Sequence, residues 1–299
     1  MSRRGWLLFL ALGVMWGVPY LLIKVAVEDL DPAVVVFGRC ALGALLLLPV
    51  AIHRRLLAPV FRRWKILVLY TFVEIIGPWL FLGHAEQRLS SSTAGLLIAV
   101  VPLIAALLTL RQDRLDLRRA AGLIIGLGGV ATLVGLDVHF DDLGAVGLAM
   151  LTAIGYAVGP IIINRSLSDL PPIGVVTGSL LISSVVYLPI TIWLWPAHIG
   201  VPAGLSVVGL AVVCTAGAFL VFFALIAEAG PARATVITYV NPAVAILLGV
   251  LVLSEPFTVG VAVGFPLVIL GSILATARSR TRSEASDPNP EPTPAAEAT

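Results

Sequence analysis

The sequence predicts an all-α integral membrane protein with ten transmembrane helices arranged as two inverted five-helix repeats. Three observations indicate this fold class: the apolar composition, the number of long apolar runs, and an internal similarity between the two halves of the chain. Hydrophobic residues make up 59% of the 299 residues, and the mean hydropathy is +1.04. Soluble domains contain roughly 45–50% apolar residues, so the chain is too apolar for a soluble protein.

A helix needs roughly 17 to 25 apolar residues to cross the hydrocarbon core of a bilayer. Ten runs meet this requirement, and no segment requires a strand. The runs lie at about 6–27, 33–52, 65–83, 93–110, 119–136, 143–163, 173–195, 204–226, 233–253 and 258–277. Residues 278–299 are rich in Pro, Glu, Ser and Ala, which predicts a disordered cytoplasmic tail.

The distribution of basic residues predicts the orientation. With a cytoplasmic N-terminus, 16 of the 19 Lys and Arg residues lie on the inner side, only Arg88 lies in an outer loop, and Lys24 and Arg39 fall within helices. Cytoplasmic loops carry such an excess, so we expect a multi-pass plasma-membrane protein with both termini in the cytoplasm. The net charge of +2 offers no basic surface for nucleic acid. The expected partners are the lipid bilayer and a small molecule, and both a monomer and a homodimer remain open.

The two halves of the chain resemble each other. Residues 17–32, GVPYLLIKVAVEDLDP, pair with residues 157–172, AVGPIIINRSLSDLPP, at an offset of 140. Farther along, at offsets of 140 or 142, the pairs are Pro102 with Pro242, Gly122 with Gly264, and Gly129 with Gly271. The predicted units are therefore residues 1–136 and 137–277. Because each has five helices, equivalent helices cross the membrane in opposite directions, an architecture typical of transporters that open a midplane site to each side in turn.

Three segments resemble the EamA family of the drug/metabolite transporter superfamily: VMWGVPYLLIKVAVEDLDPAVVVFGRCALGALLLLP, FLGHAEQRLSSSTAGLLIAVVPLIAALL and AEAGPARATVITYVNPAVAILLGVLVLSEPFTVGVAVGFPLVILG. The landmarks are Trp16, Gly17, Lys24, Arg39, Pro102, Pro242, Glu255, Gly264 and Gly271. The resemblance covers residues 6–277. It implies ten helices with cytoplasmic termini, a central cavity lined by both halves, and movement of small polar metabolites, often outward.

Lys24 and Arg39 lie inside predicted helices. Lys24 is about eight residues past the middle of the first run, roughly 12 Å toward the outer face. From there its ammonium group can reach the interface and Glu28 at i+4. We predict that Lys24, and Arg39 at a comparable depth, are outer anchors; a gate or a contact with a substrate carboxylate is the alternative.

Glu74 lies near the middle of the third run, ten residues after Trp64 and eight before Leu82. Its short side chain cannot reach either interface from that depth. Acids at the membrane midplane tend to face a cavity and to take part in proton relays, so Glu74 is predicted to bind substrate or a proton. Pro78 follows at i+4 and predicts a kink beside the acid. A carboxyl group that is hydrogen-bonded within the bundle and has no part in transport is the alternative.

Pro102 and Pro242 interrupt the fourth and ninth runs, and corresponding breaks of this kind point to a binding site in inverted-repeat carriers. Besides Glu74, the residues predicted to bind substrate are Trp16, Tyr20, Trp79, Tyr156, Tyr239 and Asn241. Aromatic rings present amphipathic faces to a cavity, and the last two residues flank Pro242, where they can hydrogen-bond a ligand. Helix packing is the alternative for Tyr239 and Asn241, and an interfacial belt is the alternative for Tyr20.

No catalytic constellation is recognisable. The four histidines fall in or beside different loops, without the spacing of metal ligands, and no nucleotide-binding loop is present. We therefore expect no enzyme, cofactor or metal. The predicted function is secondary transport of small polar metabolites such as amino acids by alternating access, with export favoured and proton coupling left open. A passive facilitator or channel is the alternative, and a membrane-embedded lipid-modifying enzyme is a more distant one.

Overall fold

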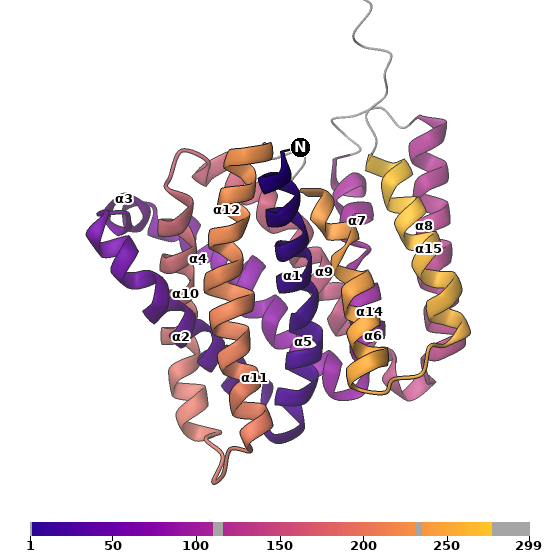
Figure 1. Ribbon diagram of the computed structural model, residues 1–299, viewed down its shortest axis with the longest axis horizontal. Coiled ribbons are helices and arrows are strands. Elements are labelled where there is room, and N and C mark those ends of the chain that lie inside the picture. The colour runs from indigo at the N-terminus through magenta and orange to yellow at the C-terminus, as the bar shows by residue number, and fades with distance from the viewer. Residues whose placement is uncertain (1, 110–115, 231–234, 277–299) are drawn as a thin grey trace, which may run out of the picture.

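The computed structural model describes residues 2–109, 116–230 and 235–276, which form a bundle of helices without a strand (Figure 1). Within these residues, nine spans are long and apolar enough to cross a membrane. The all-helical membrane fold predicted from the sequence is confirmed. The predicted tail at residues 278–299 lies outside the described residues.

The first half of the chain contains five spans, two of them made of several segments. Single helices form the first, second and fifth spans, and a short helix, α3, precedes the third. The elements are α1 (Arg3–Asp29), α2 (Pro32–His53), α3 (Leu57–Arg62), then α4 (Trp64–Thr71), η1 (Phe72–Ile76) and α5 (Gly77–Arg88) in the third span, α6 (Ser91–Ile98) and α7 (Val101–Leu108) in the fourth, and α8 (Leu117–Asp137).

The second half follows the same order. Its elements are η2 (Phe140–Asp142), α9 (Leu143–Ile162) and η3 (Ile163–Leu167), then α10 (Pro172–Trp193), then α11 (Val201–Ala211), η4 (Val212–Gly217) and α12 (Ala218–Ala229), then η5 (Thr235–Tyr239) and α14 (Asn241–Val252), and finally α15 (Val259–Thr276). The predicted ninth run at 233–253 is not one continuous α-helix, because the 3₁₀ helix η5 precedes a 12-residue α14. Its first two residues lie outside the described part of the chain.

Two kinds of departure from regular α-helix recur 140 residues apart in the chain. The π-helical segments η1 and η4 begin at Phe72 and Val212, which are 140 residues apart. Pro102 and Pro242 are each the second residue of the helix that follows a break, α7 and α14. Proline is tolerated in a first turn because the N–H that it lacks has no partner within the helix there. The breaks therefore fall directly before these prolines.

Helices from the two halves alternate in the packing of the bundle (Figure 1). Helix α1 packs against α11 and α14, whereas α9 packs against α5, α6 and α7. Helix α2 lies against α10, and α6 lies against α14. The contacts of α1 with the eighth and ninth spans thus correspond to the contacts of α9 with the third and fourth spans.

Helices α8 and α15 run antiparallel in close contact, and glycines allow their approach. A Cβ atom on Gly129 would lie 2.9 Å from the Gly264 carbonyl oxygen, and one on Gly122 would lie 2.8 Å from the Gly271 oxygen. Such distances leave no room for a side chain. We call these four residues the glycine seam; small residues at a membrane-helix interface permit close backbone packing.

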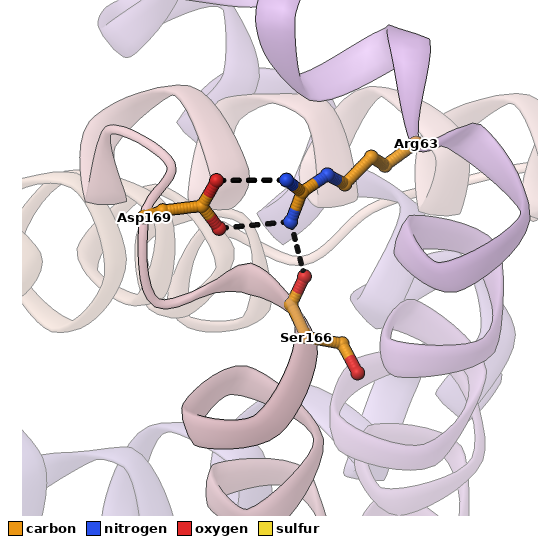
Figure 2. A network of polar contacts seen from close by, with 3 residues as sticks. All are labelled: Arg63, Ser166 and Asp169. Atoms are coloured by element: carbon orange, nitrogen blue, oxygen red, sulfur yellow. Dashed lines mark hydrogen bonds and ion pairs between the residues drawn. The ribbon is translucent and has the colours of Figure 1, made fainter.

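The two ends of the bundle are distinguished by the residues that lie there. At the end that contains Arg3, Arg63 binds both carboxylate oxygens of Asp169 at 2.8 Å and also donates to the Ser166 carbonyl oxygen (Figure 2). At the end that contains Asp29, the Glu255 carboxylate accepts hydrogen bonds from the Ser91 and Ser92 nitrogens at 2.7 and 3.0 Å. Both contacts join the first half of the chain to the second, and we refer to the Arg3 end and the Asp29 end.

Candidate functional site

Arg39 lies inside the bundle on α2, with a side chain that is only 8% exposed. Its Nε donates to the Thr215 hydroxyl oxygen at 2.8 Å, and its guanidinium carbon lies 3.5 Å from the centroid of the Trp79 ring. A hydroxyl group and an aromatic face compensate part of the cost of burying a cation. The ion pairs of the described residues are Arg63–Asp169 and Arg88–Asp142, so Arg39 has no carboxylate partner among them. Arg39 is therefore enclosed by the bundle rather than directed to its surface.

A narrow cleft surrounds Arg39 and Trp79 in the half of the bundle toward the Asp29 end. Four helices line it, three from the first half of the chain and α11 from the second. The lining residues are Ile23, Pro32, Val35, Val36, Arg39, Trp79, Gly83 and Leu210. The free space in the cleft is about that of one water molecule. The structure thus has a nearly closed, mainly apolar cleft with one cation in its wall.

Two of the predicted tyrosines lie close to Arg39. Tyr20 of α1 is buried and Tyr156 of α9 is half-buried. Both phenol groups interact electrostatically with Arg39 and with each other. Trp79 stacks on the same guanidinium group. Three of the residues predicted to bind substrate therefore gather around one buried cation, and each comes from a different helix.

Three other predicted residues lie apart from this cluster. Trp16 packs against Phe219 and Phe222 of α12, with ring centroids 6.1 and 4.9 Å away. The Tyr239 hydroxyl lies 2.9 Å from the Thr276 hydroxyl of α15. Asn241, at the start of α14, has a buried side-chain oxygen without a hydrogen-bond partner. The contacts of Trp16 and Tyr239 lie between helices, and for Tyr239 helix packing is the alternative considered from the sequence.

Glu74 lies in the π-helical segment η1 of the third span. Its Oε2 is buried and has no hydrogen-bond partner. The carboxylate faces Gly159 of α9, where a Cβ atom would collide with it. Pro78 follows in the first turn of α5. The acid therefore lies between the third and sixth spans, and its electrostatic contact with Tyr156 relates it to the cluster around Arg39.

Lys24 contacts a helix end that the sequence did not suggest. Its ammonium group donates to the carbonyl oxygens of Glu86 and Leu89 at 2.7 and 2.9 Å. These are carbonyls at the C-terminal end of α5, where a cation is favourable because the helix dipole is negative. The expected contact with Glu28 is not formed. Lys24 instead holds α1 against α5 beside the cleft.

Glu86 is a buried acid that the sequence analysis missed. Its side chain is 0% exposed, and neither carboxylate oxygen has a hydrogen-bond partner. Trp79, Gly83 and Glu86 follow one another at i, i+4 and i+7, so they share one face of α5. The predicted third run ended at residue 83, whereas α5 continues to Arg88. The helical spacing from Trp79 is the signal that identifies it.

Comparisons with known proteins identify the family of the chain. The model of the EamA-like transporter family matches two segments of the chain, residues 3–135 and 143–277. A solved crystal structure with 20% sequence identity superposes on this chain with a TM-score of 0.67. The alignment covers 92% of this chain and 98% of the chain in the crystal structure. At that identity the likeness shows the fold alone.

Three curated relatives resemble the chain over most of its length. The "Uncharacterized transporter YvbV" of Bacillus subtilis is 27% identical, with 93% of each chain covered. An "Uncharacterized transporter" of Archaeoglobus fulgidus is 23% identical, with 90% of this chain and 97% of the relative covered. The "Uncharacterized inner membrane transporter YedA" of Escherichia coli K12 is 28% identical, with 80% and 79% covered. Together with the family match, these likenesses place the chain among multi-pass membrane transporters, and it belongs to the EamA-like transporter family.

Proposed function

We propose that the protein is a secondary transporter that exports small polar metabolites, such as amino acids and related compounds, by alternating access. The observation that carries this proposal is the buried Arg39, which has an aromatic ring and a hydroxyl group beside it and no carboxylate partner among residues 2–109, 116–230 and 235–276. A guanidinium group binds carboxylates and phosphates through paired N–H donors. The carboxylate of a metabolite is therefore the group that Arg39 would hold.

The architecture that we propose for this cycle is ten helices in two inverted repeats, residues 1–136 and 137–277. Three findings support it: the two separate matches to the family model, the π-helical segments 140 residues apart, and the exchanged helix contacts. Both halves contribute to the cluster around Arg39, since Thr215 and Tyr156 belong to the second half. A relative movement of the halves would therefore change the environment of a ligand bound there.

For the orientation, we propose that the Arg3 end of the bundle faces the cytoplasm and that the protein lies in the plasma membrane. The excess of Lys and Arg in the segments at that end supports this, because basic residues are retained on the cytoplasmic side. The Escherichia coli relative carries the name of an inner membrane transporter. In this orientation the narrow cleft lies in the outer half of the membrane.

We further propose that Glu74 binds the coupling proton. Its Oε2 is buried and unpartnered, and it faces the backbone of α9, an element of the second half. A carboxyl group at such a place would gain and lose a proton as the two halves move. Flux through a passive facilitator would need no such exchange.

The test begins with a thermal-shift screen of metabolites on the purified protein, followed by flux measurements in proteoliposomes with the compounds that stabilise it. A transporter coupled to protons should accumulate substrate against its gradient when a pH difference is imposed. A facilitator should only equilibrate it. Stabilisation by carboxylates in the wild type, but not in an Arg39→Gln variant, would support the assigned site; equal stabilisation of both proteins would refute it.

A further inference from the structure

Glu86 is a buried acid, in addition to Glu74, that has no role in the proposed function. It lies two turns beyond Trp79 on the same face of α5, between the cleft and the Asp29 end. Both of its oxygens are buried without a hydrogen-bond partner. A carboxyl group in such a place needs an explanation, because buried polar groups almost always find partners.

The charged groups near Glu86 come from two other elements. Lys24 of α1, whose ammonium group donates to the Glu86 carbonyl oxygen, and Glu255, in the segment between α14 and α15, both interact electrostatically with the Glu86 carboxyl group. The phenol groups of Tyr20 on α1 and Tyr156 on α9 also interact electrostatically with it. Lys24 uses two of its three N–H donors on backbone carbonyls. No ion pair of the described residues includes Glu86, so its carboxyl oxygens lie beyond ion-pair distance from the ammonium group.

An ionised carboxylate without hydrogen bonds in an apolar bundle is very costly, and a proton removes most of that cost. We propose that Glu86 is a proton-binding site: in this closed form its carboxyl group holds a proton, which it releases to water when the Asp29 end opens. The step is the loss of the proton from one carboxyl oxygen, without any other bond change. The release step rests on the proposed alternating access, whereas the protonation in the closed form does not.

A metal cation suits this position poorly. The ammonium group of Lys24 lies close by and would repel it. Among residues 2–109, 116–230 and 235–276, no group of three or more His, Cys, Asp or Glu side chains is arranged to hold a metal ion. Glu255 is already occupied by the Ser91 and Ser92 nitrogens and the Ser92 hydroxyl group. The proton is therefore the cation that fits.

The test is infrared spectroscopy of the purified protein in lipid nanodiscs, because a protonated carboxyl group has a C=O stretching band that a carboxylate lacks. At neutral pH the wild type should show this band, and Glu86→Gln should lose the part that one carboxyl group contributes. Glu255→Gln is the matched control and should keep the full band, because the Glu255 carboxylate oxygens already accept hydrogen bonds from Ser91 and Ser92. Equal bands in the wild type and in Glu86→Gln would overturn the proposal.

A second variant covers the case in which Glu86→Gln does not fold. A neutral carboxyl group in an apolar site is replaceable by an apolar side chain, so Glu86→Leu should elute as a single species and keep its melting temperature. Failure of both variants to fold would also overturn the proposal, because it would mean that the negative charge is needed. The infrared measurement requires no substrate, so its outcome is independent of whether the transport function itself is right.

Discussion

The guanidinium carbon of Arg39 lies 3.5 Å from the centroid of the Trp79 ring, and this pair joins α2 to α5 inside the membrane. The geometry leaves the outer N–H groups of the guanidinium without a carboxylate among the described residues. A cation–aromatic contact away from water is worth about 2 kcal/mol or more. The pair therefore stabilises the bundle and leaves these N–H groups available for the proposed ligand.

Replacing Arg39 should weaken ligand binding more than it weakens the fold. A hydrogen bond to a charged group is worth about 1.5–3 kcal/mol, so Arg39→Gln should raise the dissociation constant of an anionic ligand about 10- to 100-fold. Arg39→Lys should give a smaller increase. Calorimetry with a ligand from the thermal-shift screen measures both. Arg88→Gln, at the exposed Asp29 end, is the control, and wild-type affinity in Arg39→Gln would contradict the site.

Glu74→Gln should remove the coupling of flux to a pH difference. The amide keeps the size and hydrogen-bonding shape of a protonated carboxyl group, so the protein should still fold, and substrate exchange should continue. Flux in proteoliposomes measured between about pH 5 and 8 checks this. Glu28→Gln, on the exposed end of α1, is the matched control. A variant with the wild-type pH profile would mean that Glu74 is structural.

Two neighbouring glycines of α8 should respond oppositely to alanine. A Cβ atom on Gly129 would meet backbone atoms of α15 at 2.8 and 2.9 Å, whereas one on Gly128 would meet nothing within 4 Å. Gly129→Ala should therefore cost about 1–3 kcal/mol through overpacking, and Gly128→Ala should stabilise the helix by about 0.5–1 kcal/mol. Melting temperatures in detergent decide between them. Equal effects would show that α8 and α15 do not approach so closely.

The proposed orientation predicts which introduced cysteines react from outside the cell. Phe140 and Leu117 are 86% and 88% exposed, at the Asp29 and Arg3 ends respectively. A membrane-impermeant maleimide should label Phe140→Cys in intact cells and Leu117→Cys only after permeabilisation. The native Cys40 and Cys214 are fully buried and give little background. The reverse labelling pattern would place the Arg3 end outside.

The contact of Arg63 with Asp169 should contribute little to stability but should depend on salt. Both side chains are exposed, and exposed ion pairs contribute about 0–1 kcal/mol. Asp169→Asn should therefore lower the free energy of unfolding by less than about 1 kcal/mol, and the difference should shrink at high ionic strength. Denaturant titrations at low and high salt measure it. A large loss that salt does not alter would mean that Asp169 has a further buried role.

The sequence predicted the helical spans well because crossing a bilayer imposes a minimum apolar length. It failed where tertiary packing extends a helix beyond its apolar run. The HAEQR segment after residue 83 is polar enough to resemble a loop, yet α1 covers it and it continues α5. Glu86 was therefore assigned to no helix, although it is completely buried.

The residues of the candidate site are only partly predictable from the sequence. Hydropathy gives the depth of a residue in the membrane but not the direction of its side chain. Tyr20, Trp79 and Arg39 lie on helix faces that meet, whereas Trp16 is directed toward α12. Arg39 was expected at the surface because a lone arginine in a membrane helix usually reaches for an interface. The ring of Trp79 and the hydroxyl of Thr215 make the interior acceptable instead.

In the glycine seam, Gly122 contacts Gly271 and Gly129 contacts Gly264. Gly122 pairs with Gly264 and Gly129 with Gly271 in the internal sequence similarity, so replacing each glycine by its equivalent turns one contact into the other. A surface that binds its own equivalent in the antiparallel direction is self-complementary. Consider a separate five-helix fragment that ends with α8. The face of α8 that contacts α15 in this chain would be free there, and it would fit the same face of a second copy inserted in the opposite orientation. In the proposed inverted repeat, joining two such units in one polypeptide would fix their opposite orientations and leave each free to differ, as Glu74 and Cys214, 140 residues apart, do.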